Sequence, residues 1–199
     1  IGDHAFANCY MKGKLTIPDK IEIIEEAVFE NCINLEGILV IPPSVKTLGK
    51  SAFLGCTKLT WSLTIPSTVV NYGDSVFQRC SGLTGELTIP SNMETIPSSM
   101  FNGCSGFTGT LNIPSTVTSI KQSAFANCIG FTGTFVIPQN IKTISASVFS
   151  GCPNGFVEVG HECVACDLSC GECHSSASEC TSYKKGLYLH GSSCVQLCP

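Results

Sequence analysis

The hydrophobic residues of this chain recur at a fixed spacing of 24 residues. Each repeat carries a cysteine, a phenylalanine three positions before it, and an Ile-Pro pair between successive cysteines. Self-similarity at such a period is typical of a stacked solenoid, in which each repeat buries its apolar face against its neighbours. The spacing therefore predicts a solenoid over residues 1–155, with about six to seven repeats, of which the first is truncated.

The residues before each Ile-Pro proline alternate between apolar and variable. In Leu63-Thr64-Ile65, and at the same positions of the other repeats, two apolar residues flank a variable one. This period of two predicts a short strand whose apolar side chains point inward. The proline ends the strand because it cannot donate a ladder hydrogen bond. One strand per repeat then stacks into a parallel sheet, and we expect turns or short helical segments on the convex side.

One turn position is glycine in most repeats, at Gly37, Gly85, Gly109 and Gly133. A tight bend or a positive φ angle suits glycine, because it has no Cβ. Trp61 takes this position in its own repeat.

The series Leu-x-Ile-Pro-Ser-x-Val, followed by Ile and then by Ser-x-Phe-x-x-Cys-x-x-Leu, resembles the BspA-like family of leucine-rich repeats over residues 1–152. The resemblance implies a curved leucine-rich-repeat solenoid with its strands on the concave face. It also implies a microbial surface or secreted adhesin that binds host matrix proteins, host cells or other microbes.

The repeat cysteines admit two interpretations. Equivalent residues of adjacent turns would lie about 4.8 Å apart, which is within reach of a disulfide, and a metal bound along the stack is a related option. Their Cβ vectors would be parallel, however, and that is poor disulfide geometry. We therefore expect small buried side chains with a weak S–H donor, although Cys152 differs because it ends the last repeat. The expected buried free thiols are Cys32, Cys56, Cys80, Cys104 and Cys128.

The remaining residues, 156–199, have a different composition, with seven cysteines in a short segment. Their spacing and the later Gly186-x-Tyr188-Leu189 resemble a furin-like, growth-factor-receptor type cysteine-rich repeat, although Tyr183 stands where that pattern usually has a cysteine. Such a density predicts disulfides made in an oxidising compartment, and an odd number leaves one cysteine without a partner inside the segment. The disulfide candidates are Cys163, Cys166, Cys170, Cys173, Cys180, Cys194 and Cys198.

Two other chemistries fit the tail less well. The pairs Cys163/Cys166 and Cys170/Cys173, with His161 or His174 as a further ligand, are spaced too closely for a zinc ribbon. A thioredoxin-like redox site needs a βαβ context, which is absent. We therefore expect no metal and no cofactor. The segment 156–159 alternates like a strand, and we expect it to pair with the last solenoid strand and to cap the open end of the core.

Composition excludes several classes of function. A net charge of −4 without a cluster of Lys or Arg argues against nucleic acid and anionic lipid as partners. No apolar run approaches the ~20 residues of a membrane span. Because Ile1 to Cys9 corresponds to the second half of a repeat, we expect the chain to be a fragment, attached to a membrane only through segments outside it. The four histidines are isolated and no catalytic motif is present, so an enzyme is not expected.

A partner would contact the outer face of the predicted sheet. Most positions there are small and uncharged, but Ile38, Val40 and Val136 are apolar, and Trp61 is a large aromatic of the kind that anchors interfaces. The candidate face consists of Lys14, Thr16, Ile38, Val40, Trp61, Ser62, Thr64, Glu86, Thr88, Thr110, Asn112, Thr134 and Val136. We expect an extracellular, surface-displayed protein-binding solenoid that serves adhesion, with a host surface or matrix protein or another microbial surface protein as partner. The alternative is a structural or antigenic coat protein without a specific ligand.

Overall fold

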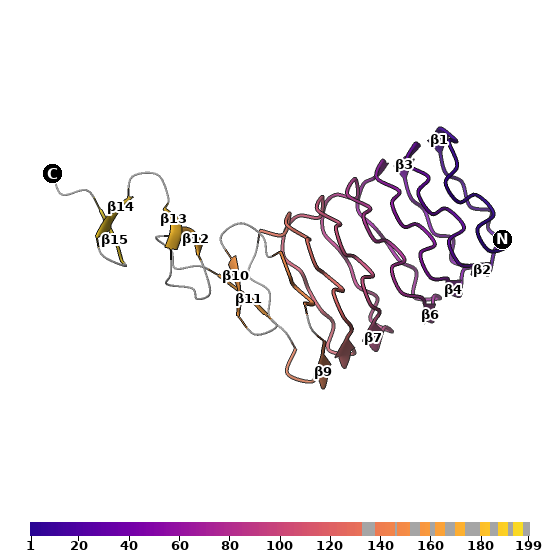
Figure 1. Ribbon diagram of the computed structural model, residues 1–199. Helices are drawn as coiled ribbons and strands as arrows, with labels where there is room; N and C mark the ends of the chain where they lie inside the picture. The colour runs from indigo at the N-terminus through magenta and orange to yellow at the C-terminus, as the bar shows by residue number, and fades with distance from the viewer. Residues whose placement is uncertain are drawn as a thin grey trace.

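The repeats form a solenoid whose turns lie side by side, as the spacing predicts (Figure 1). The computed structural model describes residues 1–132, 138–145 and 147–151, and the backbone of six strands between residues 156 and 196. Each turn has three sides: two carry short parallel strands, and the third is an irregular hydrogen-bonded segment. Within these residues we find no helix long and apolar enough to cross a membrane.

The first side carries a parallel sheet in the order β1 (Gly13–Lys14), β3 (Leu35–Ile38) and β5 (Leu59–Thr60). Single bridges extend it, from Trp61 to Leu83 and from Thr64 through Thr88 to Asn112. The predicted parallel pairing of the Leu-x-Ile segments is therefore present, but the continuous strands begin earlier than expected. The reason is a change of register after the glycine position: Trp61 and its partner Leu83 are 22 residues apart, whereas Thr64 and its partner Thr88 are 24 apart.

The second side carries strands that the sequence analysis did not predict. One sheet has the order β2 (Ile23–Ile24), β4 (Thr47–Leu48) and β6 (Asn71–Tyr72), and another has the order β7 (Thr95–Ile96), β8 (Ser119–Ile120) and β9 (Thr143–Ile144). In most of these strands the second residue faces the core and the first faces outward. The expected short helical segments are absent from the described turns, because two-residue strands already satisfy the backbone here.

The third side contains the phenylalanine and cysteine of each repeat. Alternate N–H groups donate to the next turn, as from Phe53 to Val76 and from Gly55 to Gln78, and the pattern continues through the described turns. Two residues per turn have a positive φ angle, such as Ser75 at 59° and Arg79 at 60°. Ser75 and Arg79 themselves donate to the next turn, and Phe77 between them does so as well.

The core is a column of stacked aromatic rings. Phe53 and Phe77 lie 5.7 Å apart between ring centroids with an interplanar angle of 5°, and Phe77 and Phe101 lie 5.9 Å apart. All three are fully buried. Each buried ring of this size stabilises the fold by ~1.5–3 kcal/mol relative to an exposed one, so the stack gains its stability from contacts between neighbouring turns.

After the solenoid the backbone forms antiparallel strand pairs. β10 (Phe156–Val159) pairs with β11 (Glu162–Ala165), β12 (Cys170–Cys173) with β13 (Cys180–Tyr183), and β14 (Leu187–His190) with β15 (Ser193–Gln196). The expected strand at 156–159 is present and pairs with β11. Its predicted pairing with the last solenoid strand stays a prediction, because residues 135–137 lie outside the described residues. Cys152 and the side chains of the seven tail cysteines lie outside the described residues.

Candidate binding surface

The predicted face lies on the outside of the first sheet. Leu63 and Ile65 are buried and Thr64 between them is exposed, as the period of two requires. The other described members of the face are exposed as well, except Thr110, which is half-buried. Thr134 and Val136 lie outside the described residues. The structure therefore brings most of the predicted residues onto one side of neighbouring turns.

The apolar members of this face that the structure describes lie at its N-terminal end. Ile38 is 50% exposed, Val40 is 62% exposed and Trp61 is 64% exposed. Ile38 and Val40 line a groove of about 370 Å³ with Lys14 and Asp19 at its edge. Ile38 pairs with Thr60, the residue before Trp61, so the three side chains come from adjacent turns. An exposed apolar group with charges beside it is the composition of a contact surface.

Trp61 holds a backbone conformation that its side chain disfavours. Its φ angle is 78°, close to the 84° of Gly37 and the 76° of Gly85 at the same position, which confirms the predicted positive φ. A left-handed residue with a Cβ costs roughly 1–2 kcal/mol. The ring is largely in solvent and recovers little of that cost by burial. Such unrewarded strain is found preferentially at functional sites.

The thiols of Cys80, Cys104 and Cys128 are buried and cannot react readily. Cys80 Sγ donates to the Phe53 carbonyl at 3.0 Å, and Cys104 and Cys128 make the same contact with Phe77 and Phe101 of the preceding turn. Burial raises the pKa of Cys80 and that of Cys128 to about 12, and it raises the pKa of Cys104 well above 9.0. These three thiols are thus protonated hydrogen-bond donors, and a thiol is a poor nucleophile. Cys9 differs, because it is only half-buried and its Sγ lies 2.8 Å from Cys32 Sγ.

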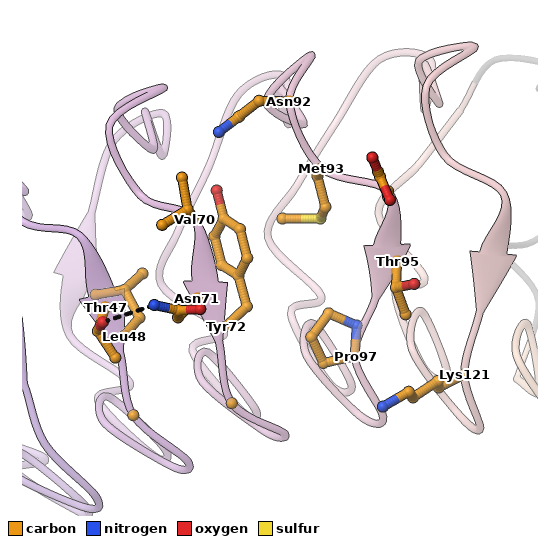
Figure 2. A pocket seen from close by; sticks show the side chains of 13 residues that line it. Thr47, Leu48, Val70, Asn71, Tyr72, Asn92, Met93, Thr95, Pro97 and Lys121 are labelled. Carbon is orange, nitrogen blue, oxygen red and sulfur yellow. Dashed lines mark hydrogen bonds between the residues drawn. The ribbon is translucent and has the colours of Figure 1, made fainter.

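The second side has an opening that the sequence analysis missed. The sheet β2-β4-β6 and the sheet β7-β8-β9 do not pair with each other, and a cavity of about 710 Å³ lies at the junction. In Figures 1 and 2, β6 and β7 stand farther apart than the strands on either side of them. Pro97 lines the cavity, at the position that is glycine in Gly49 and Gly73. Proline at this position was the signal in the sequence for a break in the sheet, since proline carries no N–H.

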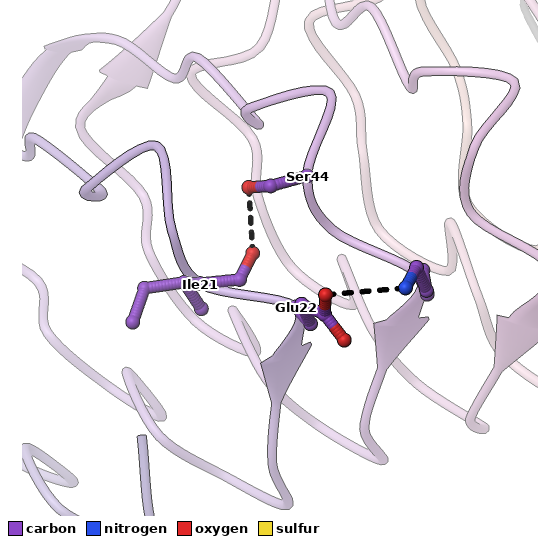
Figure 3. A network of polar contacts seen from close by, with 4 residues as sticks. Ile21, Glu22 and Ser44 are labelled. Atoms are coloured by element: carbon purple, nitrogen blue, oxygen red, sulfur yellow. Dashed lines mark hydrogen bonds and ion pairs between the residues drawn. The ribbon is translucent and has the colours of Figure 1, made fainter.

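Polar side chains elsewhere on the described turns make contacts between neighbouring turns. The Lys46 ammonium lies 3.2 Å from the Glu22 carboxylate, and Ser44 Oγ donates to the Ile21 carbonyl at 2.7 Å (Figure 3). Both contacts join adjacent turns, and the ion pair is solvent-exposed, so it contributes little to stability. In the part of the chain that the structure describes, no group of three His, Cys, Asp or Glu side chains could hold a metal ion.

Comparison with known proteins assigns the repeats to a family. The family model described as "BspA type Leucine rich repeat region" matches in six copies, over residues 1–132 and 39–156. No curated protein matches the chain.

Solved structures share the fold. A leucine-rich repeat protein from Bacteroides ovatus ATCC 8483 is 30% identical with a TM-score of 0.68, covering 76% of this chain and 38% of that one. The T. pallidum leucine-rich repeat protein is 27% identical with a TM-score of 0.58, covering 65% of this chain and 58% of that one. A leucine-rich cell surface protein from Faecalibacterium prausnitzii A2-165 is 24% identical with a TM-score of 0.53, covering 79% and 52%, and supports the fold alone. This chain thus spans only part of the length of each.

Proposed function

Because the chain belongs to the BspA-type leucine-rich repeat family, we propose that it is a protein-binding solenoid displayed outside the cell and that it serves adhesion. The partner is a protein of a host surface or matrix, or of another microbe. The observation that carries this proposal is the exposed apolar group of Ile38, Val40 and Trp61, with one of the three residues held in a strained conformation.

The proposed contact surface combines these anchors with a long polar region. Interfaces concentrate binding energy in a few aromatic and apolar side chains, which neighbouring contacts shield from water. Here Lys14 and Asp19 edge the apolar groove, and the exposed Thr64 and Thr88 continue the face along the solenoid. A partner would therefore be held at the N-terminal turns and aligned along the following ones.

Binding to immobilised matrix proteins and to host cells tests the proposal. Trp61→Ala and the double variant Ile38→Ser/Val40→Ser should each weaken binding at least tenfold, because they remove the apolar anchors. Ile129→Ser is the matched control, since Ile129 is 55% exposed and lies in the turn after Cys128, away from the face. Equal affinity of all variants would contradict the assignment of this face.

The second candidate function is a surface coat that serves as a spacer. The small, uncharged side chains at Thr64, Thr88 and Thr110 favour it, because they offer few anchors. No binding to any matrix protein or cell at micromolar concentrations would support the coat and contradict adhesion.

We further propose that residues 156–199 form a disulfide-linked module of the furin-like type, consistent with an extracellular location. A peptide map of the non-reduced protein should then show disulfides that join tail cysteines. A map in which all seven are alkylated without reduction would contradict both the module and the oxidising compartment.

A further inference from the structure

The junction between β6 and β7 leaves backbone groups without the partners that they have at neighbouring junctions. Lys46 O accepts from Val70 N at 2.9 Å and Asn71 N at 3.1 Å, and Glu94 O accepts from Thr118 N at 2.8 Å. The corresponding bonds from Glu94 N and Thr95 N to Val70 O are absent from this described part of the chain. Both walls of the opening thus present strand-edge backbone groups that are paired at the neighbouring junction between β4 and β6.

Pro97 explains why the chain does not close the junction itself. At the same position of other turns, Gly73 N donates to Leu48 O at 2.8 Å and Lys121 N donates to Ile96 O at 3.0 Å. Proline has no N–H, so Tyr72 O cannot receive the equivalent bond. A side chain at this position is not in itself an obstacle, because Lys121 makes the bond. The missing donor is the decisive difference.

Both ends of the opening are fixed by side chains. Asn92 Nδ2 donates to Ser67 O and to Val69 O, each at 2.9 Å, and Ser98 N donates to Asp74 Oδ1 at 3.0 Å. The other two sides of the same turns also stay paired, as between Thr64 and Thr88. The opening is therefore a preformed slot, confined to the second side of the solenoid.

The walls of the slot are suited to a polypeptide. Figure 2 shows the Tyr72 ring and Met93 between β6 and β7, with Thr95, Pro97 and Lys121 along the β7 side. Tyr72 Oη already donates to Val69 O at 2.8 Å, so the ring is held in place. Unpaired strand edges recognise an extended peptide through its main chain, in the manner of β-augmentation.

We propose that the slot between β6 and β7 binds an extended peptide segment, which lies between the two strands and hydrogen-bonds to both. This site is separate from the face that carries Trp61, and it does not depend on the proposed adhesion. Main-chain recognition makes it tolerant of the sequence of the peptide, provided that the backbone amides are free.

The test uses a fluorescent peptide with the sequence Thr-Val-Thr-Ser-Ile-Lys, which copies residues 116–121. These residues include β8, which pairs with a strand on each of its two edges within the solenoid. The full chain should bind it, and amide hydrogen exchange at Glu94 and Thr95 should slow at least tenfold on binding. The same peptide with alternate N-methylated amides should bind at least tenfold more weakly. Failure of the first peptide to bind, or equal binding of the N-methylated one, would overturn the proposal.

Two variants connect the binding to this slot. Pro97→Lys supplies the N–H that Lys121 has in the next turn, so it should close the slot and abolish peptide binding. Trp61→Ala should leave peptide binding unchanged, which separates this site from the adhesive face. Binding retained in a folded Pro97→Lys variant would contradict the site. Slower amide exchange at Glu94 and Thr95 with an oligosaccharide such as cellopentaose, but not with the peptide, would also overturn the proposal. That result would identify a carbohydrate site instead.

Discussion

The side of each turn that carries phenylalanine and cysteine differs from the side that carries β2 to β9. On the phenylalanine and cysteine side, which is the third side of each turn, alternate N–H groups donate to the next turn at each described junction, and the Phe rings stack without interruption. On the second side, a single proline divides the sheet. Several hydrogen bonds and a buried ring hold each junction of the phenylalanine and cysteine side. Each junction of the side that carries β2 to β9 depends on a few backbone donors. Removing one donor therefore changes the second side far more.

The largest effect is expected in the aromatic column. Phe77→Ala should lower the free energy of unfolding by ~3–5 kcal/mol, because Phe77 is fully buried between two stacked rings. Urea unfolding followed by circular dichroism measures this. Phe6→Ala is the matched control, since Phe6 is 39% exposed and stacks on one ring only. An equally large loss for Phe6 would show that burial between turns is not what stabilises the column.

The thiols of the same side predict a dependence on alkaline pH. The pKa of Cys80 rises from 9.0 to about 12 on folding, so above pH 9 the unfolded chain binds fewer protons than the folded one. Stability is then fully present below pH 9 and falls as the pH rises toward 12, by at most ~1.4 kcal/mol per pH unit for each such thiol. Urea unfolding at pH 8 and pH 10 measures the slope. Cys80→Ala should reduce that slope, and an unchanged slope would contradict the assignment.

The divided sheet predicts a smaller, reciprocal effect. Pro97→Lys should raise the free energy of unfolding by ~0.5–1.5 kcal/mol through the restored hydrogen bond. Lys121→Pro should lower it by at least as much, because it removes the bond from Lys121 N to Ile96 O and opens a second gap. Amide exchange at Thr95 in the first variant and at Ser119 in the second reports the closing and the opening. No change in exchange in either variant would mean that residue 97 does not control the junction.

The smallest expected effect concerns Trp61 on the first sheet. Trp61→Gly should leave stability unchanged or raise it by up to ~1 kcal/mol, since glycine adopts the positive φ angle without strain. Thr60→Gly is the control in the same turn, and it should be destabilising because Thr60 lies in β5. A loss of several kcal/mol in Trp61→Gly would show that the ring serves the fold, and it would weaken the case for a binding anchor. Differential scanning calorimetry resolves both variants.

The repeat spacing allowed the solenoid, the outward position of Thr64 and Ile38, and the positive φ angle at Trp61 to be predicted from the chain. The strands of the second side were missed because two residues give no detectable alternation: Thr47 and Leu48 carry no pattern by themselves. Pairing of 156–159 with the solenoid stays a prediction, because a strand pattern does not specify its partner. The slot was missed because Pro97 matters only through Tyr72 O, a group of another turn.

The sequence by itself determined which side chains enter the core, because a 24-residue period places the same apolar residue over its equivalent in each turn. It also determined that the position shared by Gly37 and Trp61 suits a positive φ angle. Only the tertiary structure decided which backbone groups meet between turns, and therefore where the second sheet divides. Hydrogen bonds between turns join residues about one repeat apart, and the loss of one donor at Pro97 has its consequence on the neighbouring turn.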